Sequence, residues 1–243
     1  MEDFEPRTYG DLIADIYDEL YAELDPTAAV DMLAELAGDG PALELAIGTG
    51  RIALPLADRG VPVHGIDISE AMVERLREKP GGDRIAVTIG DFADVGVDGR
   101  FRLVYVGFNT FYALTSQEEQ LRCFANVAEH LAEDGVFVLE GFVPDLARYR
   151  HHQHVGAVKV EVDQVMLDVS RHDPVAQRID AQHVFIRESG IRLQPVQIRY
   201  AWPAELDLMA RLAGLRLRER WSGWDRGPFT ADSERHVSVY ERS

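Results

Sequence analysis

A glycine-containing turn follows a short apolar run in the first quarter of the chain. Residues 41–47 are mainly apolar, and Gly48 and Gly50 come directly after them. Such a run, stopped by glycines, predicts a buried parallel strand that ends in a tight turn with its backbone open to a ligand. With Ala53 three residues later, the spacing also fits the G-x-G-x-x-A turn of dinucleotide-binding proteins. The turn alone therefore predicts a nucleotide site of either kind.

Acidic residues near this turn indicate which kind of nucleotide the predicted site binds. Asp67 ends the second predicted strand, 17 residues after Gly50, where a carboxylate can accept hydrogen bonds from ribose hydroxyls. Asp91 follows the third strand and can accept from an adenine amino group, with Phe92 packed beside the ring. Glu44 lies inside the first strand, where it favours a cationic ligand and disfavours a pyrophosphate. These acids indicate a positively charged nucleoside.

The elements that must position these residues alternate in type up to residue 142. Apolar runs predict strands at 41–47, 61–67, 85–89, 101–106 and 135–142. Three- and four-residue apolar spacing predicts helices at 8–37 (interrupted by Pro26, with Thr27 as a cap), 51–59, 71–79 (capped by Ser69) and 118–131. Alternating strands and helices predict right-handed crossovers and a parallel sheet covered on both faces.

The pattern changes after residue 150. Apolar and polar residues alternate over 157–169, 177–187 and 191–200, which predicts an antiparallel sheet of about three strands inserted on the main sheet. A helix at 203–213 and a closing pair of strands, 215–221 and 236–241, are expected at the sheet edge.

Composition excludes several classes of partner. The chain has 243 residues, 46% of them hydrophobic, which is enough for one core and an insertion without a disulfide or a metal. Its net charge of −17 disfavours duplex DNA and anionic membranes, which bind basic surfaces. Cys123, the single cysteine, favours the reducing cytosol. No apolar run reaches the roughly 18 residues of a membrane span. We therefore expect a cytoplasmic protein with neither nucleic-acid nor membrane partners, as a monomer or homodimer.

Taken together, these motifs resemble the class I S-adenosylmethionine-dependent methyltransferases. The matching residues are 44–50, Asp67, 90–92, and Leu131 with Gly135 before the fifth strand. The resemblance covers about 9–142 and, more loosely, 203–241. It implies an α/β fold with a Rossmann-like parallel seven-stranded sheet and an inserted antiparallel sheet as a substrate lid. The expected domains are 1–145 with 201–243 as the core and 146–200 as the lid.

One residue departs from the family pattern. Ala46 stands where such families usually have glycine. A methyl group should be tolerated there only if the backbone does not need a positive φ.

The resemblance implies S-adenosylmethionine as the cofactor and places residues around it. Gly48 and Gly50 would line its methionine part, and Phe108 and Asn109 would border the methionyl amino group. The complete set of implied cofactor contacts is Tyr9, Tyr17, Tyr21, Glu44, Ala46, Gly48, Gly50, Asp67, Ile68, Met72, Asp91, Phe92, Phe108 and Asn109. Asp67 would hold the ribose, and the adenine would lie between two pairs of residues, Ile68 with Met72 and Asp91 with Phe92. The tyrosines belong to an N-terminal helix expected to close over the cofactor; core packing explains Tyr17 and Tyr21 equally well.

The implied reaction is methyl transfer to N or O of a small molecule held between the sheet and a lid like that of aminosugar N-methyltransferases. Tyr112, Glu140 and His154 are candidates for substrate contact or proton removal. His151, His152 and His154 are interpreted as solvated loop residues, so no metal is expected. The alternatives are an NAD(P)-dependent oxidoreductase and a non-catalytic protein that binds S-adenosylmethionine.

Overall fold

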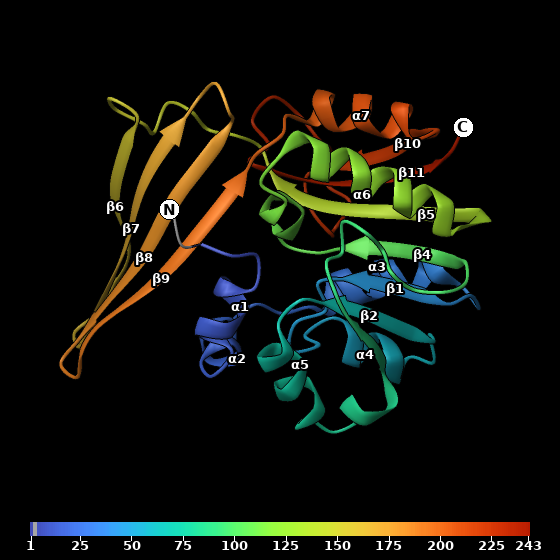
Figure 1. Cartoon of the computed structure of the whole chain (residues 1–243), viewed down its shortest axis with the longest axis horizontal. Coiled ribbons are helices and arrows are strands. Elements are labelled where there is room, and N and C mark those ends of the chain that lie inside the picture. Colours follow the sequence, from blue (N-terminus) through green and yellow to red (C-terminus); the bar gives the residue numbers. More distant parts are fainter. Residues whose placement is uncertain (2–3) are drawn as a thin grey trace.

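A computed structural model describes residue 1 and residues 4–243 (Figure 1). The helices are α1 (Thr8–Ile13), α2 (Tyr17–Leu20), α3 (Thr27–Ala37), α4 (Ala53–Asp58), α5 (Glu70–Arg77), α6 (Gln117–His130) and α7 (Pro203–Leu212), with short turns of 3-10 helix at η1 (Gly82–Arg84) and η2 (Thr110–Ala113). The strands are β1 (Ala42–Leu45), β2 (Val63–Asp67), β3 (Ala86–Ile89), β4 (Phe101–Val106), β5 (Leu131–Phe142), β6 (Gln153–Val160), β7 (Gln164–Asp173), β8 (Arg178–Arg187), β9 (Gly190–Arg199), β10 (Leu215–Trp221) and β11 (Arg235–Arg242). Within the described part, no helix is long and apolar enough to cross a membrane.

Seven strands form the main sheet, in the order β10-β11-β5-β4-β1-β2-β3. The expected seven-stranded sheet of class I methyltransferases is confirmed, and it is mixed, because β11 runs antiparallel to both β5 and β10. The parallel strands β1, β2 and β4 end at one edge, so the turns that follow them lie close together.

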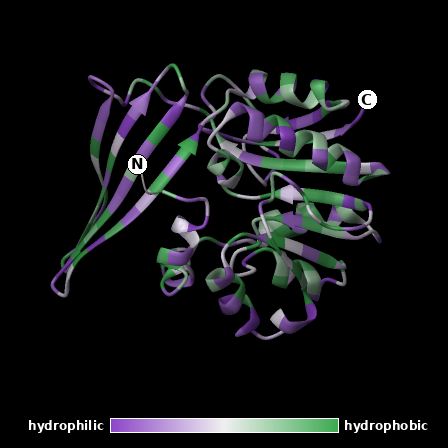
Figure 2. Cartoon of the chain, viewed as in Figure 1, coloured by the Kyte–Doolittle hydropathy of each residue, from purple (hydrophilic) through white to green (hydrophobic). Residues whose placement is uncertain are grey.

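Helices cover both faces of this sheet, as expected for strands that are apolar throughout. Phe124 of α6 and Met209 of α7 pack on one face, and Leu33 of α3 and Leu56 of α4 pack on the other. The middle of the sheet is therefore mainly apolar apart from a few buried polar residues such as Glu44 and Glu140, while the outward sides of the helices are largely polar (Figure 2).

The insertion forms a second, separate sheet of four antiparallel strands in the order β6-β7-β8-β9. The predicted inserted antiparallel sheet is confirmed, but it has four strands rather than about three. Residues 161–163 form a turn that separates β6 from β7, and their apolar–polar alternation had hidden this turn within one long strand. The inserted sheet stands beside the main sheet, with β9 nearest the core and β6 outermost (Figure 1).

Local signals placed most helix ends correctly. Ser69 caps α5 by accepting a hydrogen bond from the Met72 N–H, as expected. Thr27, however, is the first residue of α3, and the Asp25 carboxylate accepts from its N–H at 2.9 Å. The predicted helical region 8–37 is divided into α1, α2 and α3.

Candidate active site

The turn after β1 bends through three residues with positive φ. Gly48 and Gly50 have φ of 56° and 78°, and Ala46 has φ of 57°. The condition under which a methyl group at Ala46 causes no strain is therefore not met. An L-residue in this region carries a backbone cost of roughly 1–2 kcal/mol. The turn thus keeps a strained conformation in which the Gly48 N–H is directed at Asp67, at the end of β2.

The two glycines of the turn have different surroundings. A Cβ at Gly50 would lie 2.4 Å from Leu76 Cδ1, so this glycine lets α5 pack against the turn. A Cβ at Gly48 would lie 3.5 Å from Met72 Cε, an ordinary contact, with no other atom within 4 Å. Gly48 therefore leaves open space beside Met72, which the sequence placed next to the adenine.

Asp67 ties the turns after β1 and β2 together. One carboxylate oxygen accepts the Gly48 N–H at 2.7 Å and the other accepts the Ser69 N–H at 2.9 Å. Burial raises the pKa of Asp67, and the N–H donors of Ser69 and Gly48 oppose that rise. The acid predicted to hold the ribose thus lies at the meeting point of the two turns.

Replacing Asp67 with alanine is expected to weaken S-adenosylmethionine binding by about 1.5–3 kcal/mol, the value of hydrogen bonds to a charged acceptor. Loss of the Gly48 contact also loosens the turn, so calorimetric titration is paired with a thermal melt. Asp67→Asn keeps one acceptor oxygen and is expected to fall between the two proteins. Wild-type affinity in Asp67→Ala contradicts the assignment to the ribose.

Glu44 is a buried acid beneath the turn. Its carboxyl accepts a hydrogen bond from the Tyr105 hydroxyl at 2.9 Å. Burial raises the pKa of Glu44 to about 8, although the positive charge of Arg51 lowers it. A cationic ligand nearby stabilises the ionised form of such a carboxyl, so Glu44 suits a positively charged nucleoside.

Helices α1 and α2 cover both turns. A Cβ at Gly10 would lie only 2.7 Å from Ser69 Cβ, which shows how closely α1 approaches the turn after β2. Asp11 accepts a hydrogen bond from the Ser69 hydroxyl at 2.6 Å. Asp18 accepts from the Thr49 hydroxyl at 2.7 Å. The N-terminal segment thus lies over the carboxyl edge of the sheet, where the sequence placed it.

Four aromatic side chains, three from this segment and one from the loop after β4, meet above the edge. The Tyr9 and Tyr21 hydroxyls are 3.0 Å apart, and the Tyr17 and Tyr21 ring centroids are 4.7 Å apart. Tyr21 meets Phe108, which has φ of 59°, at 5.4 Å between centroids. Burial raises the pKa of Tyr17 to about 12, so its hydroxyl stays neutral. Aromatic faces of this kind stabilise cations.

Sequence reasoning missed Arg51, which follows the turn directly. Its guanidinium carbon lies 5.9 Å from the centre of the Phe108 ring, and its charge affects both Glu44 and Tyr17. The sequence signal that could have identified it is a cationic residue directly after the glycine turn. Arg51 thus links the first turn of the sheet with the end of β4.

Glu140 and Asn109 lie where β4 and β5 end. The buried Glu140 carboxylate accepts the Phe108 N–H, and burial raises the pKa of this carboxyl. The Asn109 side-chain oxygen accepts the Phe142 N–H at 2.8 Å. Asn109 therefore supports the backbone of β5, and Glu140 places a carboxyl at the edge of the sheet, next to the four aromatic side chains.

The residues predicted around the adenine lie on adjoining loops. Ile68 is partly exposed and Met72 is buried. The Asp91 carboxylate accepts the Ala93 N–H at 2.8 Å, and Phe92 packs into the core. These side chains lie after β2 and β3 as expected, and their contacts with adenine stay a prediction.

The other two candidates for substrate contact lie elsewhere. Tyr112 is fully buried, and its hydroxyl lies 3.1 and 3.2 Å from the carbonyl oxygens of Phe142 and Ala201. Its hydroxyl therefore connects the two chain segments that join the sheets, at Phe142 and Ala201, and is not available to a substrate. His154 lies in β6, the outermost strand, and not in a loop; its Nδ1 is 3.3 Å from the Arg148 carbonyl. Only Glu140 of the three lies at the carboxyl edge.

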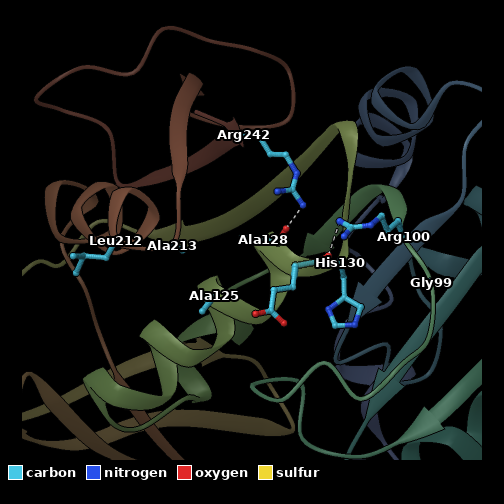
Figure 3. Close-up of a pocket in the computed structure, with 9 residues that line it drawn as sticks. Gly99, Arg100, Ala125, Ala128, His130, Leu212, Ala213 and Arg242 are labelled. Atoms are coloured by element: carbon cyan, nitrogen blue, oxygen red, sulfur yellow. Dashed lines mark hydrogen bonds between the residues drawn. The ribbon is translucent and has the colours of Figure 1, made fainter.

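A hollow between α6 and α7 is lined by Arg100, His130 and Arg242 (Figure 3). It opens at the amino end of β4, away from the turns described above. Arg100 and Arg242 already donate to carbonyls at the end of α6. The hollow is therefore separate from the site at the carboxyl edge.

Comparison with known proteins matches this geometry. The sequence profile of a family described as "Methyltransferase domain" matches residues 42–135. The CcbJ methyltransferase from Streptomyces caelestis is 43% identical in sequence, and its structure matches with a TM-score of 0.93 over 99% of this chain and 100% of that one. The chain is a class I S-adenosylmethionine-dependent methyltransferase. The oxidoreductase alternative is thereby excluded.

Two further similar proteins have lower sequence identity to this methyltransferase. A cypemycin N-terminal methyltransferase from a Streptomyces species is 26% identical over 98% of this chain and 99% of its own length. CalS10, an amino pentose methyltransferase from Micromonospora echinaspora, has a TM-score of 0.68 and 22% identity over 94% of this chain and 97% of that one, which shows the shared fold. Its structure contains S-adenosylmethionine.

S-adenosylmethionine is the cofactor of this methyltransferase, and the residues at the carboxyl edge fit its chemistry. Buried acids at Glu44 and Asp67 suit an ammonium group and ribose hydroxyls, the tyrosines suit a sulfonium cation, and Gly48 leaves space beside the turn.

Proposed function

We propose that this methyltransferase transfers a methyl group to N or O of a small-molecule acceptor, held between the carboxyl edge of the main sheet and the inserted sheet. In this proposal, residues 146–200 act as the substrate lid on a core formed by 1–145 and 201–243. The observation that carries it is the attachment of β9 to the segment over the cofactor edge. Arg192 of β9 forms hydrogen bonds of 3.0 and 2.7 Å with Asp15, between α1 and α2.

Amine nitrogen is the favoured methyl acceptor within this class. The relatives include proteins named for N-terminal and sugar N-methylation. An amine arrives as an ammonium ion at neutral pH and must lose a proton before it attacks. The net charge of −17 favours cationic acceptors over anionic ones.

S-adenosylmethionine supplies an electrophilic methyl group, so the protein's task is alignment and exclusion of water. Asp67 fixes the ribose, the turn at Gly48 lines the methionine part, and the tyrosines of the N-terminal segment cover the site. Glu140 is the candidate proton acceptor, directly or through a water molecule, because its buried carboxyl has a raised pKa.

Turnover on a panel of small amines and alcohols tests this function. Release of S-adenosylhomocysteine, with the methylated product detected by mass spectrometry, is expected for small amines and absent without an acceptor. Tight cofactor binding with no acceptor methylated favours the non-catalytic alternative and contradicts the proposal.

A further inference from the structure

One face of the inserted sheet carries a row of polar side chains directed toward the cofactor side. The strand register places Asp168 of β7 opposite His183 of β8, and His183 opposite Gln194 of β9. Alternate residues of a strand share a face, so Gln194 lies on the same face as Arg192. Arg192 pairs with Asp15 beside α1, which places the polar row on the face toward the N-terminal helices.

This row is short of hydrogen-bond partners. Among the residues that the structure describes, seven buried side-chain nitrogen or oxygen atoms lack a partner, and five belong to this face. They are Asp168 Oδ1, Ser170 Oγ, His183 Nδ1, and Gln194 Nε2 and Oε1. Gln194 is 1% exposed and Ser170 is 4% exposed. Native proteins leave few such atoms unpaired, so their concentration on one face points to a ligand.

The free groups of the row are mixed donors and acceptors. Asp168 uses its other oxygen on Arg148, at 2.9 Å, and keeps one oxygen free to accept. Burial lowers the pKa of His183, so its ring is neutral and offers one donor and one acceptor. The Gln194 amide adds a donor and an acceptor. Ser170 adds a hydroxyl that lies beside Tyr149 and opposes the rise that burial causes in the pKa of Tyr149, but it forms no well-aligned hydrogen bond. A hydroxyl group both donates and accepts hydrogen bonds, so these closely spaced donors and acceptors can bind several hydroxyl groups of one small molecule.

A continuous series of contacts connects the row with the carboxyl edge. Burial raises the pKa of the Tyr9 hydroxyl, and the neighbouring Gln194 side chain opposes that rise, although the Gln194 amide atoms lack a well-formed hydrogen bond. Tyr9 contacts Tyr21, and Tyr21 packs on Phe108 at the end of β4. A molecule that lies along this series is anchored on the inserted sheet at one end and reaches the cofactor edge with the other.

We propose that Asp168, Ser170, His183 and Gln194 form a subsite that binds the hydroxyl groups of a polyhydroxylated methyl acceptor, such as an amino sugar. This inference rests on the proposed function and specifies its substrate class. The subsite selects the acceptor through its non-reacting part, while the reacting nitrogen lies nearer to Glu140.

Thermal stability of the ligand-free protein gives the first test. Gln194→Met keeps the side-chain length and removes the unpaired amide, so the midpoint of unfolding is expected to stay or to rise by a few degrees. Gln197→Met is the matched control on the opposite face of β9, where the amide donates to Asp180 at 2.8 Å. The control is expected to lower the midpoint. An equal loss in both variants shows that Gln194 is already paired and overturns the proposal.

Ligand-induced stabilisation gives the second test, with S-adenosylhomocysteine present throughout. Glucosamine is compared with cyclohexylamine, an amine of similar ring size without hydroxyl groups. Glucosamine alone is expected to raise the midpoint of the wild type and of Gln197→Met, and Gln194→Met is expected to lose this shift. Equal shifts from both amines, no shift from either, or an unchanged response in Gln194→Met overturns the subsite.

The two proposals fail in different ways. If apolar amines are methylated as fast as hydroxylated ones, with Gln194→Met as active as the wild type, the subsite is wrong and methyl transfer to small amines stands. If no acceptor is methylated, the proposed function fails, and the two stability tests still report on the row.

Discussion

Replacing Gly48 with valine is expected to abolish S-adenosylmethionine binding, with Kd raised by about 100-fold or more, equivalent to ~2.8 kcal/mol. The positive φ of 56° at Gly48 directs a new side chain into the open space beside Met72. A Cβ there meets only Met72 Cε, at 3.5 Å, so the protein itself accommodates the first carbon. The cofactor competes for the same space, and isothermal titration measures the loss.

Gly60→Val is the matched control for this experiment. Gly60 has φ of 89°, no atom lies within 4 Å of its Cβ position, and it follows α4 outside the site. Both variants carry a similar backbone cost of roughly 1–2 kcal/mol and are expected to melt at similarly lowered temperatures. Only Gly48→Val is expected to lose the cofactor. Equal affinity in the two variants contradicts the placement of Gly48 beside the cofactor.

The core of the fold was predictable because its determinants are local. A parallel strand buried on both faces is a short apolar run with a glycine or an acid at its end, so β4 was predicted at its observed bounds. Asp67 and the turn at Gly48 follow from the same pattern, because parallel strands bring their carboxyl ends to one edge. The residues of the cofactor edge therefore came together as the sequence indicated.

What the sequence could not show depends on contacts between distant segments. The burial of Tyr112 arises from Phe142 and Ala201, which lie about 30 and 89 residues away in the chain. The register that aligns Asp168, His183 and Gln194 is set by strand pairing, and alternation alone does not fix pairing. The same alternation hid the turn between β6 and β7.

Glu140→Gln is expected to lower kcat by about 10²–10⁴-fold, the usual contribution of a positioned general base. The amide oxygen of glutamine can still accept the Phe108 N–H, so the end of β4 keeps its shape and the Kd for S-adenosylmethionine is expected to stay unchanged. Steady-state turnover with an amine acceptor, together with cofactor titration, separates the two effects.

The pH profile provides the sharper signature. A base acts only when deprotonated, so the wild-type rate rises as pH increases through the pKa of Glu140, which burial raises above the usual range for glutamate. Glu140→Gln is expected to lose this limb. Glu241→Gln, at the far end of β11 in a surface pair with Arg216, is the control and is expected to keep both rate and profile. A Glu140→Gln enzyme that retains the wild-type rate and pH limb contradicts the assignment, because an amide cannot take up the proton that the ammonium group must lose before the amine attacks.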